Sequence, residues 1–172
     1  MKIGIISDVH DNGPNLLKAI DVFKKKEVEI IIHCGDWGSP GATWLFMNNC
    51  DIRTISVFGN NDKDLYRFFT YKEKYNWDNL EYYGEFADLE LGGKKIAVYH
   101  GNVGEITEAL VLSRKWETVI SGHDHMPKIE SVDGVLHINP GTINCLKAGK
   151  IENNFTVAIY DLGENQAEII KL

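Results

Sequence analysis

The sequence has few cysteines and no long apolar run. Its only cysteines, Cys34, Cys50 and Cys145, are too few and too widely spaced for a disulfide framework or a thiolate zinc site. No uninterrupted apolar stretch approaches the roughly 20 residues that a membrane helix needs, and the first residues lack a signal-peptide profile. We therefore expect a cytoplasmic protein that does not associate with membranes.

Basic residues are also scarce. The sequence holds 18 Lys and Arg against 25 Asp and Glu, which gives a formal net charge of −7. Such a surface repels a nucleic-acid backbone, so we expect no stable nucleic-acid binding. The 172 residues contain neither repeats nor a flexible linker, and this predicts one domain spanning residues 1–172.

Five apolar runs each end at a side chain that can bind a metal ion. The runs are Lys2–Ser7, Glu29–Gly35, Thr54–Gly59, Lys95–Tyr99 and Thr118–Gly122, and the residues that follow them are Asp8, Asp36, Asn60, His100 and His123. Short β-branched runs of this kind are typical of buried strands. Because functional residues collect beyond the carboxyl ends of such strands, we expect one site along one sheet edge.

The segments between these runs predict the fold class. Helical spacing over residues 15–23, 41–48 and 65–69 alternates with the first strands, which indicates βα units and a parallel core. Residues 86–91 and 94–99 form a predicted hairpin around Gly92-Gly93, and residues 105–113 a further helix. Residues 128–132, 135–138, 155–160 and 167–172 then indicate antiparallel strands. A parallel first half and an antiparallel second half predict a mixed α/β protein with two sheets packed face to face and helices outside.

The chemistry of the candidate ligands restricts which metal ions the site can bind. Alternate residues of an extended chain face the same way, so Asp8 with His10, and His123 with His125, can each aim two groups together. Oxygen and imidazole donors without thiolate suit Mn, Fe, Co, Ni or Zn. Seven ligands exceed the needs of one ion but suit two ions about 3.5–4 Å apart that share a carboxylate.

Each motif alone has a structural explanation. Asp8 can cap a turn, Gly35-Asp36 and Gly59-Asn60 are common after strands, and paired histidines often lie on surfaces. The combination favours a metal site, since four of the six histidines follow strands in order with two carboxylates and an amide. His33 and His137 lie inside strand runs, so we interpret them as packing or supporting residues.

Five ordered motifs resemble those of the calcineurin-like metallophosphoesterases, especially the small YfcE-like phosphodiesterases. The motifs are Ser7-Asp8-Val9-His10, Gly35-Asp36, Gly59-Asn60-Asn61-Asp62, His100-Gly101 and Gly122-His123-Asp124-His125, followed by Asn139-Pro140-Gly141-Thr142. The resemblance implies a four-layer α-β-β-α sandwich with two divalent ions per chain, of which Mn or Ni is favoured. It also implies a homo-oligomer, either a dimer or a tetramer.

The resemblance also implies residue roles. Asp8, His10, Asp36 and His125 would hold one ion, and Asp36, Asn60, His100 and His123 the other, with Asp36 shared. Asp36, Asn60 and His100 would also be the catalytic residues, acting on a small phosphodiester or nucleotide-like substrate. Two positions depart from the family pattern. Asn61 stands where many members have a proton-donating His, and Asn102 stands where His is frequent. We expect both to lie near the substrate and Asp62 to brace the loop.

Three functions follow from this reading. A phosphodiesterase that uses water activated by two metal ions leads, because Asn61 has no proton to donate to a poor leaving group. A phosphomonoesterase or nucleotide phosphatase is the second, and it would need an acid from elsewhere. A non-catalytic metal-binding scaffold of the same fold is the third, and the occupied ligand positions argue against it.

Overall fold

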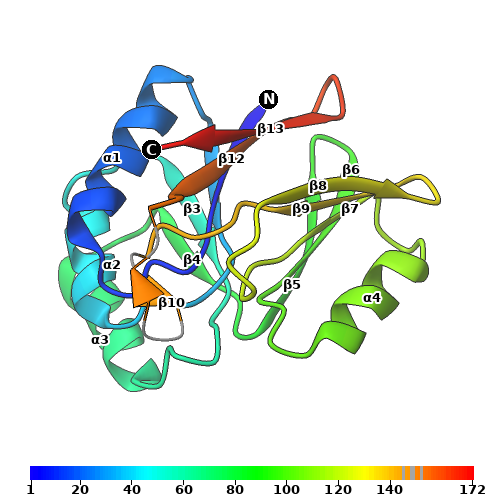
Figure 1. The fold of residues 1–172 in the computed structure, drawn as a ribbon. Helices are drawn as coiled ribbons and strands as arrows, with labels where there is room; N and C mark the ends of the chain where they lie inside the picture. Colours follow the sequence, from blue (N-terminus) through cyan, green and yellow to red (C-terminus); the bar gives the residue numbers. More distant parts are fainter. Residues whose placement is uncertain (145, 148–149, 152) are drawn as a thin grey trace.

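The computed structural model describes residues 1–144, 146–147, 150–151 and 153–172, so Cys145 lies outside the described residues. Strands and helices alternate along the chain (Figure 1). Their bounds are β1 (Lys2–Ile6), α1 (Gly13–Lys25), β2 (Ile30–His33), α2 (Pro40–Met47), β3 (Arg53–Ser56), α3 (Leu65–Tyr75), β4 (Leu80–Tyr82), β5 (Phe86–Leu91), β6 (Lys94–Tyr99), α4 (Gly104–Leu112), β7 (Thr118–Ile120), β8 (Lys128–Val132), β9 (Val135–Asn139), β10 (Leu146–Lys147), β11 (Lys150–Ile151), β12 (Thr156–Asp161) and β13 (Gln166–Lys171).

The first sheet has the strand order β13-β12-β1-β2-β3-β4. Strands β1 to β4 pair in parallel, and β12 and β13 extend the sheet antiparallel beside β1. Ile6, His33 and Ser56 stand in register at the carboxyl ends of β1, β2 and β3. The chain segments that follow these three residues therefore leave the sheet at the same edge.

The second sheet has the order β5-β6-β7-β9-β8. Its central strands β6, β7 and β9 are parallel, and the edge strands β5 and β8 pair antiparallel with them. Helix α4 covers the outer face of this sheet, while α1, α2 and α3 cover the outer face of the first (Figure 1). The predicted α-β-β-α layers are confirmed.

Alternate side chains of β1 serve two different cores. Ile3 and Ile5 are fully buried in the cluster between the two sheets, where residues of both sheets meet. Ile6 instead joins the cluster beneath the helices. Gly4 faces the ring of Phe23 on α1, and a Cβ atom there would lie 2.7 Å from a ring carbon. A strand buried on both faces carries an almost continuous apolar run, which explains the sequence of β1.

The pairing within the sheets differs from the prediction in detail. Parallel and antiparallel pairs occur in both sheets, and the C-terminal strands β12 and β13 return to the first sheet. Strand β9, expected to be purely antiparallel, also pairs in parallel with β7. Local periodicity identifies a strand but not the sheet edge that receives it, because that choice depends on contacts distant in the chain.

The prediction shortened α3 and missed β4, β10 and β11. Helix α3 continues to Tyr75 and ends at Asn76, whose φ of 52° is the left-handed C-cap conformation. Phe68, in the first half of the helix, is its one buried residue. Strand β4 has only three residues and was not predicted. Among the described residues, no helix is both long enough and apolar enough to cross a membrane.

His33 is buried between the first sheet and α2. Its ring stacks on Trp37 with centroids 3.7 Å apart, and its Nδ1 accepts a hydrogen bond of 3.2 Å from the Gly35 amide. The Ser56 hydroxyl oxygen lies 3.1 Å from the same nitrogen. Burial disfavours the charged ring and lowers the pKa of His33 to about 3. The interpretation of His33 as a packing and supporting residue is confirmed.

We expect His33 to make the fold less stable in mild acid. The unfolded chain binds a proton at this ring near pH 6.5 and the folded chain does not, so stability falls as pH drops below that value. Between pH 7 and pH 5 the loss should be about 2 kcal/mol. Urea unfolding of metal-free wild type and His33→Asn at both pH values measures it. The variant, although less stable overall, should show a pH dependence smaller by this amount, and equal slopes would contradict the assignment.

Candidate metal centre

Strand ends from both sheets place the candidate ligands at one edge of the sandwich. Asp8 and His10 follow β1, Asp36 follows β2 and Asn60 follows β3. From the second sheet, His100 follows β6, and His123 and His125 follow β7. The structure brings together six of these side chains in two groups, Asp8 with His10 and His125, and Asp36 with His100 and His123. Asn60 joins the second group through a contact with His100.

The backbone at these positions is unusual. Five of the seven candidate ligands have positive φ angles, namely Asp8, His10, Asp36, His123 and His125, with values from 42° to 71°. Left-handed conformations are uncommon for residues other than glycine and cost free energy, so they persist where the surrounding structure demands them. Here they turn each side chain off its strand and toward the shared edge.

Glycines next to the ligands leave room for this crowding. A Cβ atom on Gly59 would overlap the Asp36 carboxylate, and one on Gly122 would overlap the side chains of Ser7 and Asp8. The sequence Gly-ligand at these two positions therefore has a steric cause. The flanking segment must pass directly against a neighbouring carboxylate.

In the first group, two imidazoles converge on one carboxylate oxygen. Asp8 Oδ1 lies 3.2 Å from His125 Nε2 and 3.6 Å from His10 Nε2. Asp8 is fully buried, and Oδ1 accepts no hydrogen bond. Its other oxygen, Oδ2, accepts from the Ser7 hydroxyl at 2.6 Å and from the His123 amide at 2.9 Å. One oxygen is thus held by the protein and the other is left for a cation.

In the second group, Asp36 lies between the two sets of imidazoles. Its Oδ2 is 3.3 Å from His100 Nε2 and 3.5 Å from His10 Nε2, although His10 belongs to the first group. His100 Nδ1 donates to the Cys34 carbonyl at 2.8 Å, which leaves Nε2 of the neutral ring as a bare acceptor. That nitrogen faces Asp36 and Asn60 Oδ1, the latter at 3.2 Å.

The residues present fit divalent metal ions. Lone pairs of His100, Asp36 and Asn60 face one another, and such an arrangement is repulsive unless a cation lies among them. The unpartnered buried oxygen of Asp8 has the same need. The donors are carboxylate, amide and imidazole without thiolate, a set that suits divalent ions of the first transition row.

The pKa values describe the same need for positive charge. Burial alone would raise the pKa of Asp8, but contacts with His10, His125 and His100 outweigh it and lower the pKa below its ordinary value. Burial would likewise lower the pKa of His100, yet the neighbouring Asp36 raises it above the ordinary value. Each carboxylate favours a cation beside it, whether a proton on an imidazole or a metal ion.

Asn61 lies closer to the carboxylate than the sequence indicates. Its backbone amide donates to Asp36 Oδ1 at 2.8 Å, and its side-chain amide donates to Asp36 Oδ2 at 2.7 Å. Asn61 therefore orients the carboxylate that lies between the two groups. Asn102 is exposed and lines a cavity together with His123.

Asp62 braces the loop, as predicted. Its carboxylate accepts from the backbone amides of Asp36, Gly59 and Gly38, at 2.8, 2.8 and 3.0 Å. The closing loop adds contacts that the residue pattern alone does not reveal. Thr142 donates to the Asp8 carbonyl at 2.9 Å, and Asn139 donates to the Gly122 carbonyl at 2.9 Å. The motif Asn139-Pro140-Gly141-Thr142 was the available signal for this support.

An α/β sandwich with paired oxygen and nitrogen donors at its edge is an arrangement suited to metal-dependent hydrolysis of phosphoesters. A family model described as the calcineurin-like phosphoesterase superfamily domain matches residues 1–165, and the chain belongs to that superfamily. The predicted family, fold class and phosphoesterase function are thereby confirmed. Membership also implies divalent metal cofactors, for which the structure offers two candidate sites.

Known relatives support the same assignment. A phosphodiesterase of Methanocaldococcus jannaschii is 38% identical over 141 residues, which cover 82% of this chain and 83% of that protein. A solved structure described as a novel archaeal phosphodiesterase has a TM-score of 0.89 and 34% identity, and the match covers 100% of both chains. The phosphoesterase YfcE of E. coli, with a TM-score of 0.68, 16% identity and 99% coverage of each chain, shares the fold.

Replacement of the shared carboxylate should empty both candidate sites. Asp36 contacts imidazoles of both groups, so Asp36→Ala removes a candidate ligand that faces both. We expect wild type reconstituted with Mn²⁺ to hold two ions per chain by inductively coupled plasma mass spectrometry, and the variant to hold fewer than one. Asp21→Asn, an exposed change on α1, is the matched control and should keep two ions. A variant that still holds two would refute the central position of Asp36.

Proposed function

We propose that this protein is a phosphodiesterase that depends on two divalent metal ions. Asp8, His10, His125 and Asp36 would hold one ion, and Asp36, Asn60, His100 and His123 the other. The observation that carries the proposal is the position of Asp36, whose Oδ2 lies within 3.5 Å of imidazole nitrogens from both groups. A shared carboxylate is the usual link between two catalytic ions.

When bound by these residues, divalent ions would lower the pKa of a water molecule, polarise the phosphoryl oxygens and offset the charge that develops during displacement. The residues of the chain prepare the site for that chemistry. Asp8 and Asp36 concentrate negative charge at a buried edge, and the Cys34 carbonyl fixes the tautomer of His100. With its Oδ1 turned to His100, Asn60 can present its side-chain amide to a phosphate oxygen.

The preference for diesters follows from Asn61. When water attacks phosphorus and the ester P–O bond breaks, the departing oxygen needs a proton unless it is a weak base. An amide cannot supply that proton, and Asn61 already donates its side-chain N–H to Asp36. We therefore propose that diesters with good leaving groups are hydrolysed well and monoesters poorly.

The proposal also covers the identity of the metal ions, the oligomeric state and the cellular location. Mn²⁺ or Ni²⁺ are the proposed ions, because the donor set lacks thiolate and the resembling family favours them. A homo-oligomer is proposed from the family resemblance. A cytoplasmic location is supported by the buried, unbonded thiols of Cys34 and Cys50, which a reducing compartment preserves.

Activity should disappear with the shared carboxylate. Wild type loaded with Mn²⁺ should hydrolyse bis(p-nitrophenyl) phosphate. Asp36→Ala purified identically should be at least 100-fold slower, because loss or displacement of a metal ion removes several kcal/mol of transition-state stabilisation. Release of p-nitrophenol gives both rates. Equal rates would identify a contaminating phosphatase. A wild type that holds two ions yet hydrolyses neither monoesters nor diesters would favour the scaffold function.

Asn61→His should shift the preference toward monoesters. The change adds a proton donor and removes a hydrogen bond to Asp36, so Asn61→Ala serves as the control that removes the bond alone. Relative to that control, we expect the rate on an alkyl phosphate monoester, whose departing alkoxide is a strong base, to rise about 10-fold or more relative to the rate on bis(p-nitrophenyl) phosphate. An unchanged ratio would show that the absent proton donor does not set substrate preference.

A further inference from the structure

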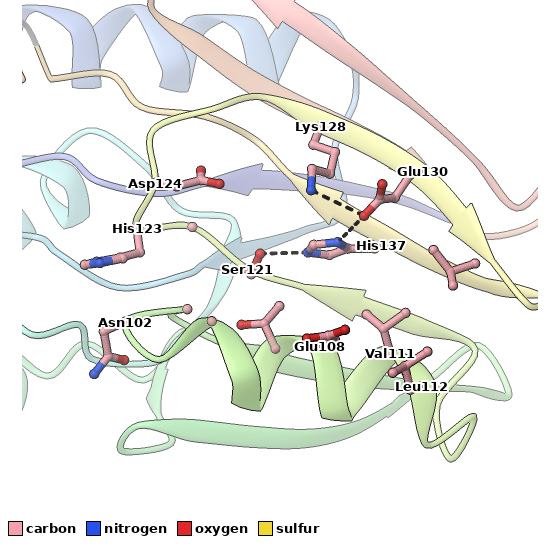
Figure 2. A pocket seen from close by; sticks show the side chains of 15 residues that line it. Asn102, Glu108, Val111, Leu112, Ser121, His123, Asp124, Lys128, Glu130 and His137 are labelled. Carbon is pink, nitrogen blue, oxygen red and sulfur yellow. Dashed lines mark hydrogen bonds and ion pairs between the residues drawn. The ribbon is translucent and has the colours of Figure 1, made fainter.

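A cavity of about 590 Å³ opens directly beside the candidate metal centre (Figure 2). Helix α4 forms one wall, strands β8 and β9 form the other, and the end of β7 lies between them. His123, a proposed metal ligand, lines the cavity together with Asn102. The volume lies in the range of pockets that bind organic molecules, which is about 300–1,000 Å³.

One wall carries a chain of hydrogen bonds that the proposed chemistry does not use. Ser121 Oγ lies 2.9 Å from His137 Nε2, and His137 Nδ1 lies 3.1 Å from Glu130 Oε1 (Figure 2). Lys128 Nζ approaches the same glutamate oxygen at 3.4 Å. A carboxylate only accepts, so His137 donates from Nδ1 and accepts the Ser121 proton at Nε2. The lone pairs of Ser121 then remain as acceptors at the cavity wall.

Ser121, His137 and Glu130 do not form a hydrolytic triad. The amides that follow Ser121 are already engaged, since Gly122 donates to the His100 carbonyl and His123 to Asp8. A serine nucleophile needs backbone donors for the oxyanion, and these two are occupied. The arrangement instead holds Ser121 and Glu130 as fixed acceptors for a ligand.

The remaining lining has the same acceptor character. The Thr107 hydroxyl on α4 is buried without a hydrogen-bond partner and lines the cavity, as does the exposed carboxylate of Glu108. Val111, Leu112 and Val132 supply an apolar surface. Lining carboxylates of Glu108, Asp124 and Glu130 outnumber the single ammonium of Lys128, so the cavity disfavours anions.

We propose that this cavity binds one of the two organic groups of the phosphodiester, and that the group is an uncharged, nucleoside-like one that donates hydrogen bonds. The inference rests on the proposed phosphodiesterase function and specifies its substrate. An apolar body fits Val111 and Leu112, while N–H or O–H donors meet Glu108, Thr107 and Ser121. Groups that carry a further phosphate are rejected by the acidic lining.

Three p-nitrophenyl diesters that release the same alcohol test the proposal. They carry a methyl group, a thymidine 5′ group, or the same thymidine with a 3′-phosphate. We expect kcat/KM for the thymidine ester to exceed that of the methyl ester and that of the 3′-phosphorylated ester by about 10-fold or more. Hydrolysis of the methyl ester, which does not need the cavity, tests the phosphodiesterase function independently.

Charge reversal at Glu108 tests the location of the subsite. Glu108→Lys should lower the thymidine-to-methyl ratio and raise the relative rate of the 3′-phosphorylated ester. Glu105→Lys makes the same change on the exposed side of α4, outside the cavity, and should alter neither ratio. Equal effects of the two variants, or equal kcat/KM for methyl and thymidine esters in wild type, would overturn the subsite.

A binding measurement judges the subsite even if no ester is hydrolysed. Thymidine titrated into ¹⁵N-labelled protein should shift backbone amide resonances of Thr107–Leu112 and Lys128–His137, and the shifts should weaken in Glu108→Lys. Shifts that are absent at millimolar thymidine, or that occur elsewhere on the protein, would refute the proposal.

Discussion

Two buried carboxylates impose the constraint on which the rest of the site depends. Asp8 and Asp36 are 0% and 1% exposed, and a buried negative charge is costly unless cations or hydrogen bonds compensate it. Asp8 directs one oxygen at the Ser7 hydroxyl and the His123 amide and the other at imidazoles. Both oxygens of Asp36 accept from Asn61, and its Oδ2 also faces imidazoles. Positive φ angles and crowded glycines at the strand ends are consequences of gathering so many polar groups around two charges.

The sandwich architecture makes this gathering possible. Parallel pairing of β1, β2 and β3 aligns their carboxyl ends, and the parallel pair β6 and β7 does the same in the facing sheet. Ligands from the two sheets therefore meet across the edge of the apolar layer between them. Because each candidate ligand follows a buried strand, its position is fixed by a packed core rather than by a mobile loop, as precise metal geometry requires.

The proposed substrate selection depends on two features, the absence of a proton donor at Asn61 and the cavity along α4. Asn61 orients Asp36 and has no proton to give, and the proposed preference for good leaving groups rests on that. The proposed subsite in the cavity along α4 lies beside the candidate ligand His123. Ser121, His137 and Glu130 belong to that wall, so the proposed subsite gives His137, which the sequence places inside a strand, a supporting role in ligand recognition.

The sequence by itself determined most of the strands, the types of the candidate ligands and their order. Each apolar run and the polar residue after it are local features, and five of them in order, with the motif resemblance, sufficed to predict the fold class and the candidate ligands. Only the tertiary structure decided which strands pair, that β12 and β13 return to the first sheet, that Asn61 binds Asp36, and that a cavity opens along α4. These features depend on contacts between segments far apart in the chain, and local periodicity carries no information about such contacts.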